Sequence, residues 1–299
     1  MKGIYSSLLV IFLLVFFLLS CKDTPSGEDH KKVISVSVLP QKFFVEKIAG
    51  NQMDVNVMIP PGASPVTYEP TPEQMKDISK SVAYFRIGPL VFEKSWMDKF
   101  KSVNPELKVY DQSGQVSLIR RESHSHSDKH KRDVNNDPHI WTSPARMVPQ
   151  LQVIRDALLQ MDSLNAKKYR ANYQNFKKEI NGLDQFIRNK LSGLENRKFM
   201  IFHPALTYYA RDYKLTQVSI EFEGKEPSPG HLRKLVDLAK DEKIQVIFVQ
   251  KQFNKETAQA IADEIDGKVI EINPLAYDWV EQMKSITQKL AEALKAEKN

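Results

Sequence analysis

Two histidines and one aspartate stand at positions where an α/β protein places ligands. His203 directly follows the apolar segment 198–202, and Asp278 comes a few residues after the segment 268–272. If both segments are parallel strands, the two side chains lie at the same edge of a sheet, and His139 can face them from the first half of the chain. Two imidazoles and a carboxylate suit a borderline divalent cation such as zinc, which usually takes four ligands. Taken singly, each residue also fits a structural role, such as a hydrogen-bonded histidine or an aspartate that caps a helix.

A second group of possible ligands is a short histidine-rich segment. Three of the seven histidines of the chain fall within seven residues, at His124, His126 and His130. This concentration indicates metal binding by composition, although it also fits a solvated polar loop. We assign no role to His30, which lies in a polar N-terminal stretch, or to His231, which lies in the first turn of an expected surface helix.

The single cysteine, Cys21, indicates how the chain leaves the cytoplasm. It follows an apolar run over residues 8–19, which is shorter than a membrane-spanning helix of about 20 residues. The run is typical of a signal peptide, here residues 1–20, and its end resembles a bacterial lipobox, in which the cysteine is lipidated and becomes the first mature residue. Residues 21–32 are polar and predict a lipid-anchored tether. The alternatives are an uncleaved anchor or a soluble export signal with an incidental cysteine.

Length and composition predict a folded protein with two domains, each with its own core. The chain has 299 residues, of which 41% are hydrophobic and 27% charged. One cysteine excludes an intramolecular disulfide and a multi-cysteine zinc cluster. The net charge of +6 is too mild, without clustering of basic residues, to indicate a nucleic-acid partner.

The elements that must position the candidate ligands alternate between strands and helices. This alternation predicts an α/β fold of two lobes, with parallel sheets flanked by helices. The predicted strands are residues 33–39, 54–59, 82–87, 198–202, 217–220, 244–249 and 268–272. A Thr71-Pro72 pair predicts the capped start of a helix.

One long helix is predicted between the lobes. Seven apolar residues from Tyr169 to Leu191 are spaced by 4, 3, 4, 3, 4 and 4 residues, which places them on one helical face. A helix over about residues 163–195 would be roughly 45–50 Å long and would join the lobes rigidly. The predicted organisation is therefore an N-terminal lobe over 33–145 with a His-rich loop at 120–133, a linking helical segment over 146–196 and a C-terminal lobe over 197–299.

Four segments together resemble a known family. Residues 62–72, 137–144, 202–215 and 273–279 resemble, in this order, the zinc and manganese solute-binding proteins of ABC transporters, the ZnuA type. The resemblance covers roughly residues 33–299. It implies two α/β lobes, a rigid linking helix and one metal ion held between the lobes.

The resemblance also implies a ligand set, from which this chain departs at one position. His139, His203 and Asp278 fall on three of the four ligand positions of the family, whereas relatives carry histidine where this chain has Val66. Valine cannot bind a metal. Either water, Glu69 or a histidine of the 120–133 loop completes the shell, or the affinity is reduced, or the site no longer serves.

The resulting prediction is an exported lipoprotein that captures a divalent cation and delivers it to the membrane permease of an ABC transporter. Zn²⁺ is expected ahead of Mn²⁺, because manganese receptors of the family tend to have glutamate at the position of His203. The protein is expected to be a monomer, anchored by its N-terminal lipid on the periplasmic or cell-surface side of a bacterial membrane, with no nucleic-acid partner.

Two alternatives stay open. A divergent member with weakened or lost metal binding would act as an adhesion or structural lipoprotein. A zinc hydrolase is the less favoured alternative, although the missing ligand would leave an open coordination position. The sequence contains no His-Glu-x-x-His helix, no Gly-x-Ser-x-Gly elbow and no glycine-rich phosphate loop, so we expect no enzyme activity.

Overall fold

The computed structural model describes residues 31–120, 136–221 and 227–295. Its contacts divide the chain into Met1–Lys31 and a second compact unit, Lys32–Asn299, which is described below. The predicted signal peptide, Cys21 and the histidine-rich segment lie outside the described residues. Within the described ranges, no helix combines the length and the apolar character needed to cross a bilayer.

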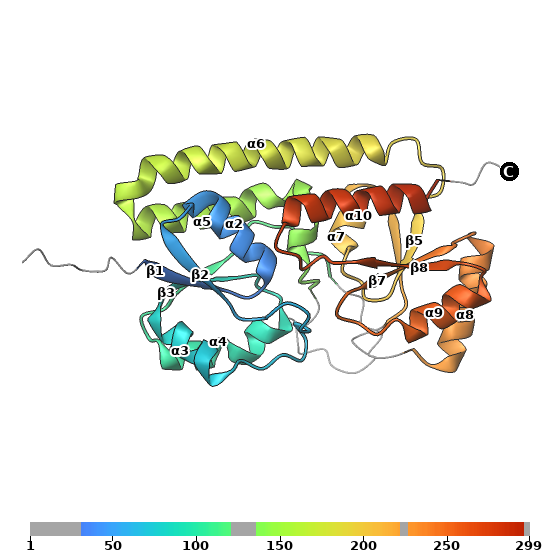
Figure 1. The fold of residues 1–299 in the computed structure, drawn as a ribbon, viewed down its shortest axis with the longest axis horizontal. Coiled ribbons are helices and arrows are strands. Elements are labelled where there is room, and N and C mark those ends of the chain that lie inside the picture. The colour runs from blue at the N-terminus through green and yellow to red at the C-terminus, as the bar shows by residue number, and fades with distance from the viewer. Residues whose placement is uncertain (1–30, 121–135, 222–226, 296–299) are drawn as a thin grey trace, which may run out of the picture. The chain divides into compact units, whose positions relative to one another are not determined.

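The N-terminal lobe is built on a parallel sheet with the strand order β2-β1-β3-β4 (Figure 1). Its strands are β1 (Lys32–Val36), β2 (Met53–Val57), β3 (Ser81–Arg86) and β4 (Lys108–Asp111), and its helices are α2 (Leu39–Ala49), α3 (Pro72–Lys80) and α4 (Val91–Val103). Thr71 caps α3 as expected, because its hydroxyl accepts a hydrogen bond from the backbone N–H of Gln74 at 3.3 Å. Strand β4 was not predicted, because its four residues begin and end with a charged side chain and contain no apolar run.

The C-terminal lobe repeats this plan with the strand order β6-β5-β7-β8, again all parallel. Its strands are β5 (Lys198–Ile201), β6 (Thr216–Ser219), β7 (Val246–Gln250) and β8 (Lys268–Ile272), and its helices are α7 (Thr207–Asp212), α8 (Pro229–Asp241), α9 (Glu256–Glu264) and α10 (Trp279–Ala293). The two lobes with parallel sheets confirm the predicted fold class. The short helix α7 was not predicted.

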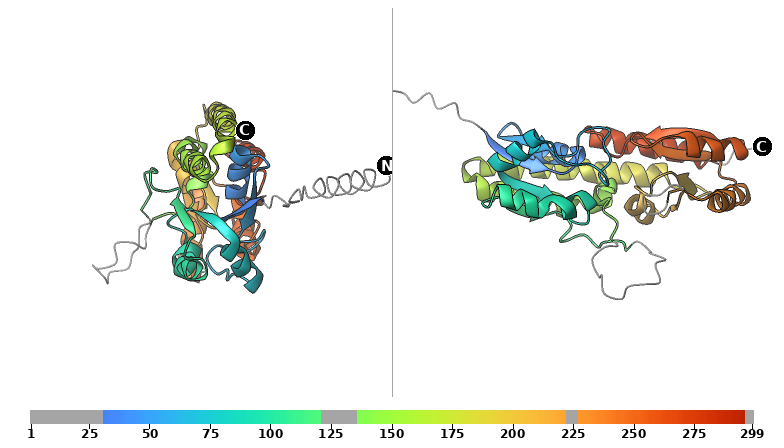
Figure 2. Two further views of the ribbon diagram at one scale, coloured as in Figure 1. Left: turned by 90° about the vertical axis from the view of Figure 1, so that its left-hand side faces the viewer. Right: turned by 90° about the horizontal axis from the view of Figure 1, so that it is seen from below.

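Helices α5 (Met147–Met161) and α6 (Ala166–Lys190) link the lobes, preceded and joined by short 3₁₀ turns η1 (Ile140–Thr142), η2 (Pro144–Arg146) and η3 (Ser163–Asn165). Helix α6 packs against α2 in the first lobe and α10 in the second, so it runs along both lobes (Figures 1 and 2). Its buried face carries the predicted apolar residues from Tyr169 to Ile187. The helix is shorter than predicted, because residues 163–165 form a 3₁₀ turn and the chain leaves the helix after Lys190.

The hydrophobic core corrects the expectation of one separate core per lobe. A large cluster extends from the first lobe through α5 and α6 into the second lobe, where it includes Phe199 and Ile201 of β5. Met200, which points to the other face of the same strand, belongs to a smaller cluster under α8 and α9. The inner face of the second sheet is therefore fused to the first lobe, and relative motion of the lobes would disturb buried apolar contacts.

Both sheets offer a ligand crevice by their topology. The chain passes from β1 to β2 on one side of the first sheet and from β3 to β4 on the other, and the adjacent strands β5 and β7 connect to opposite sides in the same way. Parallel α/β sheets bind ligands at the carboxyl ends of the strands at such a switch point. The loops that follow these strands are therefore the places to search for the site.

Candidate metal centre

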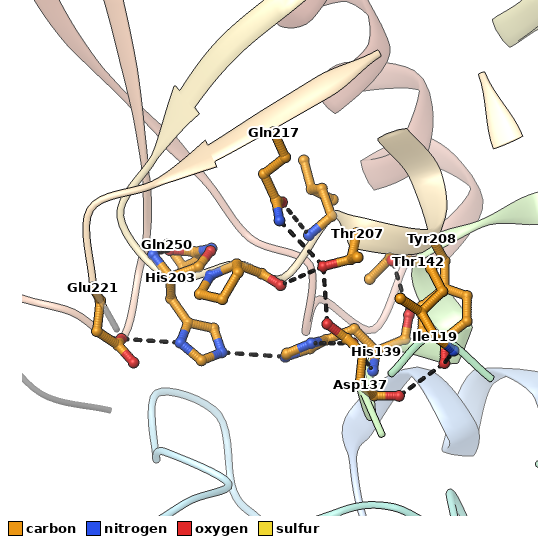
Figure 3. Close-up of polar contacts among 12 residues, drawn as sticks. Ile119, Asp137, His139, Thr142, His203, Thr207, Tyr208, Gln217, Glu221 and Gln250 are labelled. Carbon is orange, nitrogen blue, oxygen red and sulfur yellow. Dashed lines mark hydrogen bonds and ion pairs between the residues drawn. The ribbon is translucent and has the colours of Figure 1, made fainter. Parts of the chain in front are cut away.

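His139 and His203 meet at the junction of the two lobes. Their Nε2 atoms lie 3.3 Å apart, and the two rings are inclined at 74° (Figure 3). Only 8% of His139 and 7% of His203 is exposed. His203 follows β5 at the carboxyl edge of the second sheet, as predicted, and His139 immediately precedes η1. The structure thus assembles the two imidazoles that the sequence places 64 residues apart.

Each imidazole is held on its outer side by a buried carboxylate. The Nδ1 atom of His139 lies 2.9 Å from Asp137 Oδ1, and the Nδ1 atom of His203 lies 2.9 Å from Glu221 Oε2 (Figure 3). Asp137 and Glu221 are only 1% and 4% exposed. Because a carboxylate accepts hydrogen bonds, we assign the ring hydrogen of both neutral imidazoles to Nδ1.

This tautomer turns two lone pairs toward each other. With hydrogen on both Nδ1 atoms, each Nε2 is an acceptor, and two acceptors 3.3 Å apart repel unless a cation lies between them. Zinc binds histidine nitrogens at about 2.0–2.1 Å, which in a tetrahedral site places two such nitrogens about 3.3–3.4 Å apart. The observed separation fits this arrangement. Carboxylates on the outer ring nitrogens are the usual partners of metal-binding histidines.

Hydrogen bonds from helix α7 and from the backbone of His139 hold Asp137 in place behind the His139 ring. Asp137 Oδ1 also accepts from the backbone N–H of His139 at 2.8 Å, and Oδ2 accepts from the hydroxyl of Thr207 at 2.8 Å. The hydroxyl of Tyr208 donates to the Asp137 carbonyl at 2.9 Å. Burial raises the pKa of Tyr208 to about 12, so this hydroxyl stays protonated and remains a donor.

Residues of the C-terminal lobe hold His203 by contacts with both its backbone and its imidazole ring. Gln250, the last residue of β7, donates its side-chain amide to the His203 carbonyl at 2.5 Å and accepts from the His203 backbone N–H at 3.2 Å. Phe253 stacks on the imidazole with ring centroids 5.0 Å apart and planes inclined at 20°. These contacts leave His203 little freedom to turn away from its partner.

Two tryptophans hold the lobes together behind the pair. The indole N–H of Trp141 donates to the Pro274 carbonyl at 3.0 Å, and the indole N–H of Trp279 donates to the Trp141 carbonyl at 2.9 Å. Both indoles are 1% exposed. Because these hydrogen bonds are buried, separating the two histidines would cost contacts well beyond the pair itself.

A small pocket of about 50 Å³ opens beside the histidines. Its lining combines loops from both lobes, namely residues 64–66 after β2, 90–91 after β3, 252–253 after β7 and 274–275 after β8. Val66, at the position where the family resemblance implies a histidine, lines this pocket and is 48% exposed. A histidine at this position would therefore belong to the wall of the pocket that also contains His139 and His203.

Asp278 and Glu69 are not gathered with the pair in the described structure. Asp278 is exposed at the start of α10, where its side chain makes no capping hydrogen bond, and Glu69 is exposed in the loop after β2. Among the described residues, no group of three or more His, Cys, Asp or Glu side chains is arranged to hold an ion. Their assignment as ligands therefore stays a prediction. The same holds for three residues outside the described ranges: His124, His126 and His130.

Asp137 and Glu221 were not predicted, although the sequence contains a signal for each. Asp137 precedes His139 by two residues, a spacing that lets its carboxylate bond both the backbone and the ring of the histidine. Glu221 follows β6, which pairs with β5, so the strand-end argument that selected His203 applies equally to Glu221.

A third buried acid, away from the histidine pair, is Glu93 in the N-terminal lobe. Glu93, on α4, accepts hydrogen bonds from the hydroxyl of Ser37 and from the backbone N–H groups of Ile87 and Gly88, the last two at 2.7 Å. Burial raises the pKa of Glu93 to about 7. These bonds tie the ends of β1 and β3 to α4, which indicates a structural role near the carboxyl edge of the first sheet.

Comparison with known proteins identifies the family. A family model described as "Zinc-uptake complex component A periplasmic" matches residues 34–293. The chain is 25% identical to the high-affinity zinc uptake system protein ZnuA of Bacillus subtilis, over 86% of this chain and 82% of that protein. It is 26% identical to the zinc-binding lipoprotein AdcA of Streptococcus pneumoniae, over 97% of this chain. The chain spans 60% of that lipoprotein and about half, 53%, of AdcA from Streptococcus pyogenes.

The folded structure gives the same assignment. A crystal structure of ZnuA superposes with a TM-score of 0.82 and 37% sequence identity, covering 89% of this chain and all of that one. Its similarity extends over both lobes and the connecting helix. The chain therefore belongs to the ZnuA family of metal-transport solute-binding proteins, which are not enzymes.

Proposed function

We propose that this protein captures Zn²⁺ outside the cytoplasmic membrane and delivers it to the permease of an ABC transporter. The protein would be held at a bacterial membrane by a lipid on Cys21 and would act as a monomer. Family membership supports metal capture for transport, and the names of the AdcA and ZnuA relatives support zinc and an extracytoplasmic location. The Cys21 anchor is testable, since Cys21→Ala should release the protein from the membrane fraction.

One observation carries the proposal. Two buried imidazoles, each fixed by a carboxylate on Nδ1, present their Nε2 atoms to each other at 3.3 Å. A purely structural histidine pair would place hydrogen between the rings, and would not need a separate carboxylate behind each of them. The arrangement preorganises two ligands at the edge length of a zinc tetrahedron.

The imidazole at position 203 supports zinc as the cargo over manganese. Imidazole nitrogen suits zinc, whereas carboxylate and carbonyl oxygens suit harder ions such as Mn²⁺. We propose Asp278 as the third ligand, which requires its side chain to move from its exposed position at the start of α10. Because protons compete with zinc for the imidazoles, the affinity should fall as the solution becomes acidic.

The test is a zinc titration of the metal-free soluble form, residues 22–299, against a competing chelator, with elemental analysis of the dialysed complex. We expect one tightly bound zinc per chain, and its loss in the double variant His139→Ala/His203→Ala. His231→Ala is the matched control, because His231 is exposed on α8 and away from the pair. Absence of bound zinc, or an unchanged affinity in the double variant, would contradict the proposal.

A further inference from the structure

We propose that a cavity beside the histidine pair binds a small ligand of the α-amino-acid class. The ligand's nitrogen would coordinate zinc at the position that Val66 leaves open, and its carboxylate would be held by the cavity. The cargo would then be a zinc–amino acid complex rather than the bare ion. This inference rests on the proposed function, because it requires zinc at His139 and His203.

The cavity adjoins the pocket of the histidine pair. It has a volume of about 240 Å³, against about 50 Å³ for the pocket, and Gln252 and Leu275 line both. The pocket of about 50 Å³ has room for an ion but for few additional atoms. The larger one gives room for a ligand of several non-hydrogen atoms, and it meets the histidine pocket at Gln252 and Leu275.

The polar side chains of this cavity retain hydrogen-bonding capacity. Among the described residues, the side chains of Lys251 and Gln252 take part in no hydrogen bond or ion pair. Asn273 accepts a bond from the backbone N–H of Leu275 at 3.2 Å through Oδ1, which leaves its amide N–H groups for a ligand. The walls therefore offer one ammonium group and two amides, the groups that bind a carboxylate.

The charge of Lys251 is not consumed by its acidic neighbour. Glu271, the carboxylate whose pKa Lys251 helps to lower, is bound to Lys255 at 2.8 Å. Tyr277, also in the cavity wall, already donates its hydroxyl to Glu46 at 2.5 Å. The positive group that remains for an anion in this cavity, within the described part of the chain, is therefore Lys251.

The open zinc position and the polar cavity wall together fit one molecule that carries both a nitrogen donor and a carboxylate. The histidine pair would supply two donors and Asp278 is the proposed third, whereas Val66 can supply none, so a tetrahedral zinc would need one further donor. Water could fill that position but would make no use of the exposed ammonium group of Lys251 or of the neighbouring amides. A molecule with a nitrogen donor and a carboxylate a few bonds apart satisfies both, and free amino acids have this chemistry.

The test uses L-histidine as the probe and the metal-free soluble form, residues 22–299. Native mass spectrometry should show a complex of protein, one zinc and one histidine. In solution, with free Zn²⁺ read by a fluorescent indicator, histidine at ten times its own dissociation constant should lower the apparent zinc Kd about elevenfold. Imidazole, which has the nitrogen donor but no carboxylate, is the control probe and should produce a much smaller change.

Matched variants locate the carboxylate site. Lys251→Met should weaken histidine binding to the zinc-loaded protein about tenfold, the effect of losing one charge-assisted hydrogen bond. Lys255→Met, on the same loop but paired with Glu271, should leave it unchanged. Val66→His, which supplies the donor from the protein itself, should abolish the dependence of zinc affinity on histidine.

The outcomes separate this inference from the proposed function. If the protein binds zinc with the same affinity in the presence and absence of added L-histidine, compared at the same free Zn²⁺ concentration, the inference is overturned and zinc capture is left intact. Equal effects of imidazole and histidine, or of Lys251→Met and Lys255→Met, would overturn the carboxylate site. Failure to bind zinc under any condition would overturn the proposed function and this inference with it.

Discussion

Replacing Glu221 should weaken zinc binding although Glu221 is not itself expected to touch the metal. The carboxylate is 4% exposed and bonds His203 Nδ1 at 2.9 Å, so it fixes the ring orientation and raises the basicity of the coordinating nitrogen. Removing such a partner typically costs about 10–100-fold in metal affinity, or about 1.4–2.7 kcal/mol. Glu221→Gln keeps an acceptor and loses only the charge, so we expect about tenfold. Glu221→Ala loses both, so we expect about a hundredfold.

The measurement is a competition titration of zinc against a chelator at neutral pH, on variants whose fold is checked by urea unfolding. Glu242→Gln is the matched control, because Glu242 pairs with Lys198 at the other end of β5. Glu221 is preferable to Asp137 as a target, since Asp137 accepts three hydrogen bonds and its replacement would also destabilise the fold. Zinc affinities of both Glu221 variants within twofold of the unmodified protein would refute the positioning role.

Three further predictions follow from the site and from the buried acid of the first lobe. Val66→His should tighten zinc binding at least about tenfold in a chelator titration without added ligands, because it adds a donor to the pocket wall. The control Val66→Ala should leave the zinc affinity unchanged. Equal zinc affinities of Val66→His and the unmodified protein would show that another group already fills the position. His203→Glu should lower the ratio of zinc to manganese affinity in parallel titrations, because oxygen donors favour manganese; an unchanged ratio would count against the ligand role of His203. Glu93 has a folded-state pKa raised from 4.5 to about 7, so its stabilising contribution is complete below pH 4.5 and is lost as the pH rises through about 7. The free energy of unfolding of the metal-free protein can be measured by urea unfolding, for the unmodified chain and for Glu93→Gln. The difference between the two should change by up to about 3 kcal/mol between pH 4.5 and 8. A difference that does not depend on pH would contradict this.

Periodicity and strand-end logic were enough to predict the lobes and the pairing of the histidines. The apolar face of α6 was readable because its residues repeat over several turns and all are buried. His203 was readable because it directly follows an apolar strand, and parallel strands end at a common edge. In both cases a local pattern determines a long-range position.

Two short elements without a distinctive apolar pattern were not predicted. Strand β4 begins and ends with a charged residue, and α7 spans fewer than two helical turns. Helix α7 matters to the architecture, since it presents Tyr208 to the Asp137 carbonyl. The fusion of the cores was also invisible in sequence, because nothing local tells which face of β5 meets the linking helices.

The predicted ligand set shows most clearly what the sequence does not determine. Asp278 was expected with the histidines, and in the described structure it is exposed at the start of α10. Its position in sequence fixes the loop on which it lies but not the rotamer or the loop conformation. Sequence also names Val66 as the departure from the family without naming the group that replaces it.

The most direct test of the account is a crystal structure of the soluble form grown with zinc, with anomalous data collected on both sides of the zinc absorption edge. We predict an anomalous peak between the Nε2 atoms of His139 and His203, about 2.0–2.1 Å from each. An ordered structure with the peak elsewhere, or with no zinc peak between the two imidazoles, would contradict the central claim.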